Sequence, residues 1–213
     1  MKTNDLIEML ASGPVAVAPH AIRRRYAVAL GWGLAGAILL MALVLGVRPD
    51  LAHAATLPWF WFKTLFALSM TVLAVVVGSR LARPGAALQR WPLGLAAPVL
   101  VVWLVAALVL AQAAPEQRVP LMLGSTWKVC TLLITTLSIP SFAALMWAMR
   151  GLAPTHLRAA GAVTGLLSGA LAVLVYCLHC PELEAPFVGI WYLAGMLIPT
   201  AAGALLGPRL LRW

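Results

Sequence analysis

The fold is decided by stretches such as AVALGWGLAGAILLMALVLGV at residues 27–47, which contains no charged side chain and no proline. A membrane-spanning helix needs about 20 consecutive, mainly apolar residues. The stretch meets that requirement, and Arg23, Arg24 and Arg25 come shortly before it. The sequence therefore predicts that residues 27–47 cross a lipid bilayer.

Five more apolar runs follow, at residues 59–79, 93–113, 129–149, 159–176 and 187–206. Because backbone polar groups in hydrocarbon must be satisfied internally, each run is expected to be a helix. The composition agrees, with 63% hydrophobic and only 10% charged residues, against about 25% charged residues in soluble domains. We predict an all-α integral membrane bundle of six transmembrane helices over residues 27–213, after a cytoplasmic N-terminal segment at 1–26.

The basic residues predict the orientation of this bundle. One side of the predicted membrane has Lys2, Arg23, Arg24, Arg25, Arg80, Arg83, Arg90, Arg150, Arg158, Arg209 and Arg212, and the other has Arg48, Lys63, Arg118 and Lys128. Lys and Arg accumulate in cytoplasmic loops. Both termini are therefore expected in the cytoplasm, with the chain passing several times through a bacterial inner membrane. The net charge of +9 is explained by these basic residues in the loops. We expect no direct nucleic-acid partner, because the sequence has no basic face or stripe.

Charged groups are absent from the middle of every predicted span. Pumps and ion-coupled transporters usually place ionisable groups there, so this absence argues against both classes. Lys63 and Lys128 lie within about a turn of the outer interface, where we expect their long side chains to reach water.

Three cysteines form the most distinctive chemical feature. Cys177 and Cys180 close the fifth apolar run in YCLHCPE at residues 176–182, and Cys130 opens the fourth. Consecutive spans run in opposite directions, so the start of one and the end of the next share a membrane face. All three thiols are expected at similar depth on the outer face, near His179.

Such a cluster permits three interpretations. Two thiols at i and i+3 with a third from a neighbouring helix would suit a soft metal ion. Alternatively, Cys130 and Cys180 would form a disulfide in an oxidising compartment. The third interpretation is that the cysteines are small apolar packing residues, since cysteine is often buried.

The N-terminal segment begins with a short predicted helix. Residues 3–8 resemble a capping box, and Leu6, Ile7 and Leu10 form an apolar stripe. The stripe would lie on the membrane surface, held by the arginines at 23–25 near anionic lipid, or in the groove of a partner protein.

These residues also resemble a known family. The chain is similar over essentially its whole length to the NrsF family of membrane anti-sigma factors. The similar blocks are MKTNDLIE at 1–8, RPDL at 48–51, WFK at 61–63, STWKVC at 125–130, LSIP at 137–140, CPE at 180–182 and GPRLLRW at 207–213.

The resemblance implies a regulator and no enzyme. Such a protein holds an extracytoplasmic-function sigma factor inactive at the inner membrane and releases it under heavy-metal or oxidative stress. Its signal-sensing cysteines would correspond to Cys130 and Cys180, where a soft metal ion would bind transiently and no resident cofactor is required. Cys177 and His179 are further candidates for sensing. Sigma-factor docking is expected at Leu6, Ile7 and Leu10.

Two alternatives belong to other functional classes. A membrane thiol oxidoreductase would use the Cys-x-x-Cys sequence and the third cysteine, although such enzymes usually relay electrons through two cysteine pairs. A small-solute channel or carrier is disfavoured by the apolar spans. Gly161, Gly165 and Gly169 have the spacing that lets helices approach closely, either within the bundle or between two copies.

Overall fold

The computed structural model describes residues 3–12, 21–82 and 91–212. Within these ranges every regular element is helical, which confirms the all-α fold class. The elements are α1 (Thr3–Ser12), α2 (Ala21–Val44), α3 (Leu51–Ala54), α4 (Pro58–Leu81), α5 (Trp91–Gly94), α6 (Ala96–Gln112), α7 (Pro115–Leu123), α8 (Trp127–Arg150), α9 (Leu157–Tyr176), α10 (Ala185–Phe187), the π-helical η1 (Val188–Tyr192) and α11 (Leu193–Leu210).

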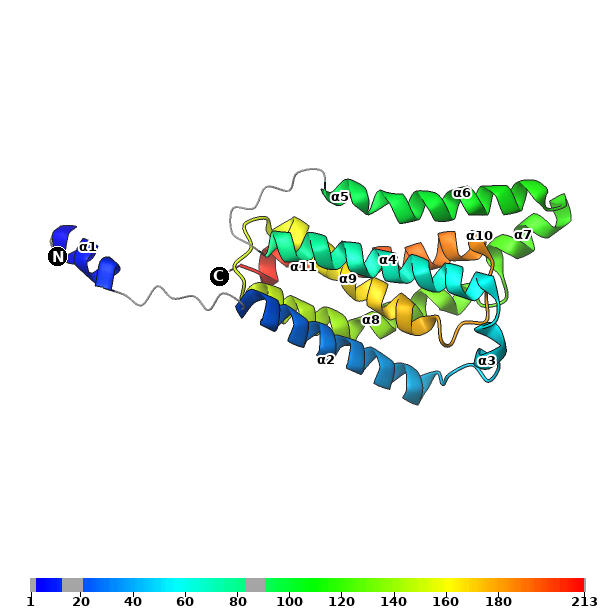
Figure 1. Cartoon of the computed structure of the whole chain (residues 1–213), viewed down its shortest axis with the longest axis horizontal. Coiled ribbons are helices and arrows are strands. Elements are labelled where there is room, and N and C mark those ends of the chain that lie inside the picture. Colours follow the sequence, from blue (N-terminus) through cyan, green and yellow to red (C-terminus); the bar gives the residue numbers. More distant parts are fainter. Residues whose placement is uncertain (1–2, 13–20, 83–90, 213) are drawn as a thin grey trace.

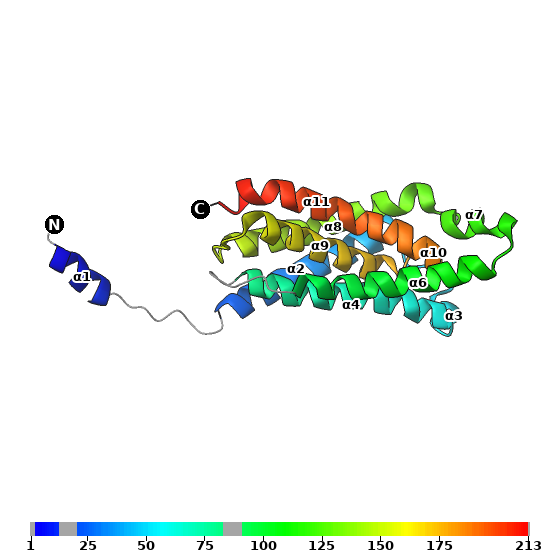
Figure 2. The ribbon, with the colours of Figure 1, turned by 90° about the horizontal axis from the view of Figure 1, so that it is seen from above.

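Six long segments lie side by side and alternate in direction (Figures 1 and 2). They are α2, α4, α6, α8, α9 and the continuous run from α10 to α11. We call the end that carries α3, α7 and residues 177–184 the distal end. The opposite, proximal end carries the start of α2, residues 151–156 and the C-terminal end of α11 (Figure 1).

Five of these segments are long and apolar enough to cross a membrane, and α6 is a shorter apolar helix. The third predicted span, residues 93–113, is interrupted near its start. Pro98 lies in the first turn of α6, and a proline clashes with the carbonyl of the fourth residue before it, which here is Gly94. The helix therefore restarts at Ala96 and contains 17 residues, close to the lower limit for a spanning helix.

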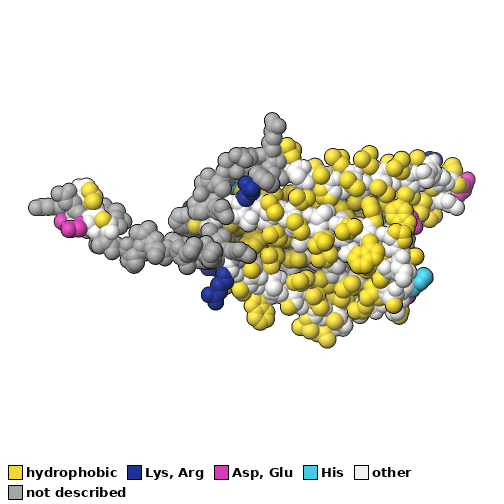
Figure 3. Space-filling model, in the orientation of Figure 1, with side chains coloured by type: hydrophobic (Ala, Val, Ile, Leu, Met, Phe, Trp, Pro, Cys, Tyr) yellow, Lys and Arg dark blue, Asp and Glu magenta, His cyan; other side chains and the backbone are white. Residues whose placement is uncertain are grey.

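The surface of the bundle is apolar. Trp32, Leu43 and Leu205 are about three-quarters exposed, and hydrophobic side chains are spread along the face of the bundle that Figure 3 shows. Contiguous apolar surface on this scale marks contact with a partner or a membrane. Together with the helix lengths, it identifies the chain as an all-α membrane bundle.

Helix α9 forms the centre and packs most closely against α11. A Cβ at Gly161 would overlap the Gly203 carbonyl, and one at Gly165 would overlap the Pro199 carbonyl. The small-residue face of α9 is therefore used inside the bundle, where it allows the two backbones to touch.

This contact predicts a stability difference between two glycines. Gly165→Ala should lower the free energy of unfolding by about 1–3 kcal/mol, because the added methyl group forces the helices apart. Gly31→Ala is the matched control, since a Cβ there would have no atom within 4 Å apart from its chain neighbours and its own helix backbone. Titrating the purified variants with SDS in mixed micelles measures both values. Equal stability of the two variants would contradict the close α9–α11 contact.

Candidate functional site

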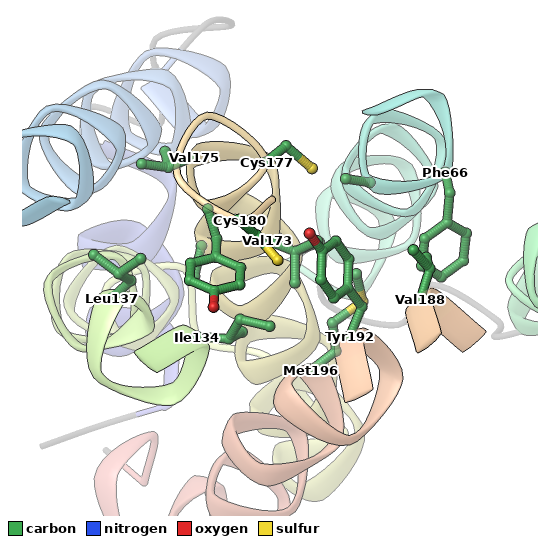
Figure 4. Close-up of a cluster of buried hydrophobic side chains, with 14 of the residues drawn as sticks. Phe66, Ile134, Leu137, Val173, Val175, Cys177, Cys180, Val188, Tyr192 and Met196 are labelled. Carbon is green, nitrogen blue, oxygen red and sulfur yellow. The ribbon is translucent and has the colours of Figure 1, made fainter. Parts of the chain in front are cut away.

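Cys130 and Cys180 meet at the distal end of the bundle. Cys130 lies in the first turn of α8, and Cys180 ends the turn that follows α9. Both side chains are fully buried, both thiols are free, and each lies within hydrogen-bonding reach of the other. Figure 4 shows the Cys180 sulfur among the buried side chains near Tyr192. We call Cys130 and Cys180 the thiol pair.

The chain folds back at Cys180 for local reasons. The Cys180 N–H donates to the Tyr176 carbonyl at 2.9 Å, so the backbone makes one more turn after α9 ends. Pro181 then follows, and a residue before proline is driven away from the helical conformation. This turn directs the Cys180 side chain back toward α8.

Cys177 does not join the pair. Cys177 continues the hydrogen bonding of α9, its N–H donating to the Val173 carbonyl at 2.9 Å, but its side chain takes a different direction from that of Cys180. The Cys177 sulfur points toward α4 in Figure 4 and lies next to Thr64. Across residues 3–12, 21–82 and 91–212, no group of three or more His, Cys, Asp and Glu side chains is placed to hold a metal ion.

The thiols at this end differ in acidity. Burial raises the pKa of the Cys177 thiol to about 12. For Cys180 the pKa is lowered, first because the Cys130 thiol can donate a hydrogen bond to its sulfur, and also because the Lys63 ammonium lies nearby. Because the thiolate is the metal-binding form, the lowered pKa favours that form at Cys180, while the raised pKa disfavours it at Cys177.

His179 contacts the chain that follows α2. Its Nδ1–H donates to the Gly46 carbonyl at 2.9 Å, and the Arg48 N–H donates to the Leu178 carbonyl at 3.1 Å. The sequence placed His179 near the thiols as a further candidate ligand. In the structure it joins the turn after α9 to the end of α2.

A buried lysine holds the Cys180 backbone. The Lys63 side chain is fully buried, and its Nζ donates to the Cys180 carbonyl at 2.8 Å and to the Glu182 carbonyl at 2.9 Å. The expectation that Lys63 reaches water was therefore wrong. Carbonyls beyond a helix end have no partner inside the helix, and buried ones need a donor, which Lys63 provides.

Arg48 supplies a second donor to the same carbonyl. Its Nη1 lies 3.2 Å from the Cys180 oxygen, while its Nε and Nη2 each donate to the Asp50 carboxylate at 2.7 Å. This ion pair holds the pKa of Asp50 at about 2, and the same hydrogen bonding raises the pKa of Arg48.

Glu182 connects the turn to the start of α8. Its carboxylate accepts from the Ser125 backbone N–H at 2.7 Å and from the Ser125 hydroxyl at 2.6 Å. Residues 180–182 are thus bonded to α4 through Lys63, to the segment after α2 through Arg48, and to the residues before α8 through Ser125. Four sequence blocks that lie far apart in the chain, at 48–51, 61–63, 125–130 and 180–182, converge at one site.

Comparison with known proteins places the chain in a family. Residues 10–213 match the family described as NrsF, negative regulator of sigma F. The chain belongs to the NrsF family. A relative named as a probable anti-sigma-F factor NrsF from Azospira oryzae is 53% identical over the whole length of both chains. The anti-sigma-F factor NrsF of Caulobacter vibrioides is 37% identical, again over the full length of both. No solved structure matches this chain.

The N-terminal helix of this NrsF-family chain forms where the sequence predicted it. Helix α1 covers Thr3–Ser12, and Ile7 is 59% exposed. The side chains of Leu6 and Leu10, the other two predicted docking residues, lie outside the described part of the structure.

Proposed function

We propose that this protein is an anti-sigma factor of the inner membrane, which sequesters an extracytoplasmic-function sigma factor and releases it when the thiol pair binds a soft metal ion or is oxidised. Membership of the NrsF family and the names of two full-length relatives support the regulatory class. The observation that carries the sensing mechanism is the contact between Cys130 and Cys180, because a bond between them would join α8 to the end of α9.

The arrangement of charges supports the proposed orientation. Helix ends and loops at the proximal end carry Arg24, Arg25, Arg80, Arg150, Arg158, Arg209 and Arg212 among the described residues. Lys and Arg accumulate on the cytoplasmic side, so the proximal end would face the cytoplasm. The thiol pair would then lie at the periplasmic side, where metals and oxidants arrive first.

The chemistry suits two kinds of signal. Two thiols supply the soft ligands that thiophilic metal ions prefer. Oxidation would instead remove two electrons and two protons from the pair and form a disulfide. The oxidant would be reduced at the same time, hydrogen peroxide to two water molecules or an organic hydroperoxide to an alcohol and water. Either product changes how the first turn of α8 sits against the turn after α9.

Helix α8 offers a route to the cytoplasmic side. The Ser141 hydroxyl donates to the Gly33 carbonyl of α2 at 2.9 Å, and a Cβ at Gly36 would lie 2.8 Å from Pro140. Nearer the proximal end, Arg25 donates to the Trp147 carbonyl at 3.2 Å and stacks over its ring. A movement of α8 would therefore displace α2, which leads back to the N-terminal segment.

The required energy is within reach of thiol chemistry. Moving a sigma factor from about 99% bound to about 1% bound takes roughly 5.5 kcal/mol of differential affinity. Structural zinc sites built on thiolates contribute about 10 kcal/mol or more. A fraction of such a binding energy would be enough to switch the complex.

The alternative functions have less support. A thiol oxidoreductase would need a second thiol pair, but the chain has three cysteines and the Cys177 sulfur faces α4. Transport of a small solute is disfavoured by the apolar spans, and no observation on the described residues supports it.

Affinity purification tests the proposal. The tagged protein is extracted from its native membranes in mild detergent, and every protein that co-purifies is identified by mass spectrometry. We expect an extracytoplasmic-function sigma factor that is absent when an unrelated tagged membrane protein is purified in the same way. Absence of any sigma factor, even after crosslinking in cells, would rule against the anti-sigma function.

A further inference from the structure

Lys63 is an unusual residue for its position. It lies inside a membrane-spanning helix with no exposed surface, and burying an ammonium group carries a large desolvation cost unless it is paired or hydrogen-bonded. The Glu182 carboxylate, the nearby acidic group, already accepts two hydrogen bonds from Ser125. The Lys63 ammonium is instead directed at two backbone carbonyls, those of Cys180 and Glu182.

The Cys180 carbonyl receives a second cationic donor, Arg48. One carbonyl oxygen therefore accepts from two cations that come from different segments of the chain. Hydrogen bonds from charged donors are stronger than those between neutral groups. Neither cation is hydrogen-bonded to a sulfur atom. Both hold the Cys180 carbonyl and with it the Cys180 backbone, while the charge of Lys63 also lowers the pKa of the Cys180 thiol.

From this geometry we propose that Lys63 and Arg48 are positioning residues that clamp the Cys180 backbone and so hold its thiol against Cys130. The inference rests on the proposed sensing role of the thiol pair. Without the clamp, the turn at residues 177–182 would be held by the Ser125–Glu182 contact and by its links to Gly46 and to the Arg48 backbone. The Cys180 thiol would then spend less time within bonding distance of Cys130.

Clamping has a measurable chemical consequence. When the pair reacts with glutathione disulfide, Cys130 and Cys180 lose two electrons and two protons and become a disulfide, and the glutathione disulfide is reduced to two glutathione molecules. The equilibrium constant of this exchange is the effective concentration of one thiol at the other. Effective concentration falls when either thiol becomes free to move away.

The test uses the full-length protein in detergent micelles, with Cys177→Ser in every variant so that two thiols remain. Each variant is equilibrated with mixtures of reduced and oxidised glutathione, and the disulfide is quantified by mass spectrometry after the free thiols are trapped. Lys63→Met removes the ammonium while keeping a long apolar side chain. Lys128→Met is the control, since Lys128 also lies near the distal start of a spanning helix but contacts the ring of Trp127.

We expect Lys63→Met to lower the effective concentration by about tenfold or more, as the loss of charge-assisted hydrogen bonds implies, and Lys128→Met to leave it unchanged. Arg48→Gln should lower it by a smaller factor, because Lys63 still holds the carbonyl. This variant carries the test if Lys63→Met does not fold, as judged by circular dichroism and gel filtration.

The outcomes separate the clamp from the sensing function. If the parent protein forms the disulfide and folded Lys63→Met and Arg48→Gln variants match it, the clamp is overturned while the sensing chemistry stands. A parent protein that forms no disulfide at any glutathione ratio would overturn the clamp and the oxidative branch of the proposed function together.

Discussion

Replacing both Cys130 and Cys180 with serine is expected to leave the sigma factor repressed and to abolish its release by cadmium or peroxide. Serine has nearly the size of cysteine, so the distal packing around α8 and α9 should persist. Its hydroxyl forms no disulfide and is a hard ligand that soft metal ions bind weakly. The measurement is a reporter gene driven by a promoter that depends on the sigma factor, read before and after each stress.

Cys177→Ser provides the matched control for this experiment. Cys177 is as buried as the thiol pair, but its sulfur lies next to Thr64, and burial raises its pKa to about 12. We therefore expect the Cys177→Ser protein to respond like the parent. A full response from the double variant would show that the thiol pair is not the sensor, and a lost response from Cys177→Ser alone would show that the pair is not sufficient.

Much of this architecture could be predicted from the sequence because membrane helices obey simple rules. Apolar runs of sufficient length placed the helices, and the alternating direction of the runs brought Cys130 and Cys180 to one end. The latter argument needs only connectivity, since a residue that opens one helix and a residue that closes the next must share a face. The contact between the two thiols is consistent with that expectation.

The remaining features depend on backbone details that hydropathy does not encode. The Cys177 side chain faces α4, and hydropathy does not determine which neighbour each side chain faces at the end of a helix. Lys63 was expected to extend to water, because a lysine near a helix end usually does so. Its true partners are carbonyls that become available only when residues 180–182 leave the helix and fold over α4.

Four of the sequence blocks quoted above, at 48–51, 61–63, 125–130 and 180–182, surround the thiol pair. The short segment that carries Cys180 also contains Glu182. It accepts hydrogen bonds from Arg48 and Lys63 at the Cys180 carbonyl and from Ser125 at the Glu182 carboxylate. None of them needs to touch a metal ion or an oxidant for its loss to matter. Their shared effect is to fix the distance between two sulfur atoms that come from different helices.

Deleting residues 2–15 is expected to abolish co-purification of the sigma factor while leaving the bundle folded. These residues contain α1, which precedes the first membrane-spanning helix, and Ile7 of α1 is exposed. An exposed apolar residue on a short helix is the kind of group that anchors such a helix in a partner's groove. Gel filtration of the truncated protein checks that the membrane domain remains intact.

A point substitution sharpens this test. Ile7→Asp should weaken sigma-factor binding by about 2 kcal/mol or more, the usual effect of losing a central apolar anchor. Thr3→Asp adds the same charge to the same helix, at an exposed position in its first turn, where a negative charge favours the helix, so binding should be retained. Titration of the purified sigma factor onto each variant in micelles gives the affinities. If the truncated protein or Ile7→Asp bound the sigma factor as tightly as the parent, docking would have to lie on the proximal loops of the bundle, and α1 would be left as a helix of the membrane surface.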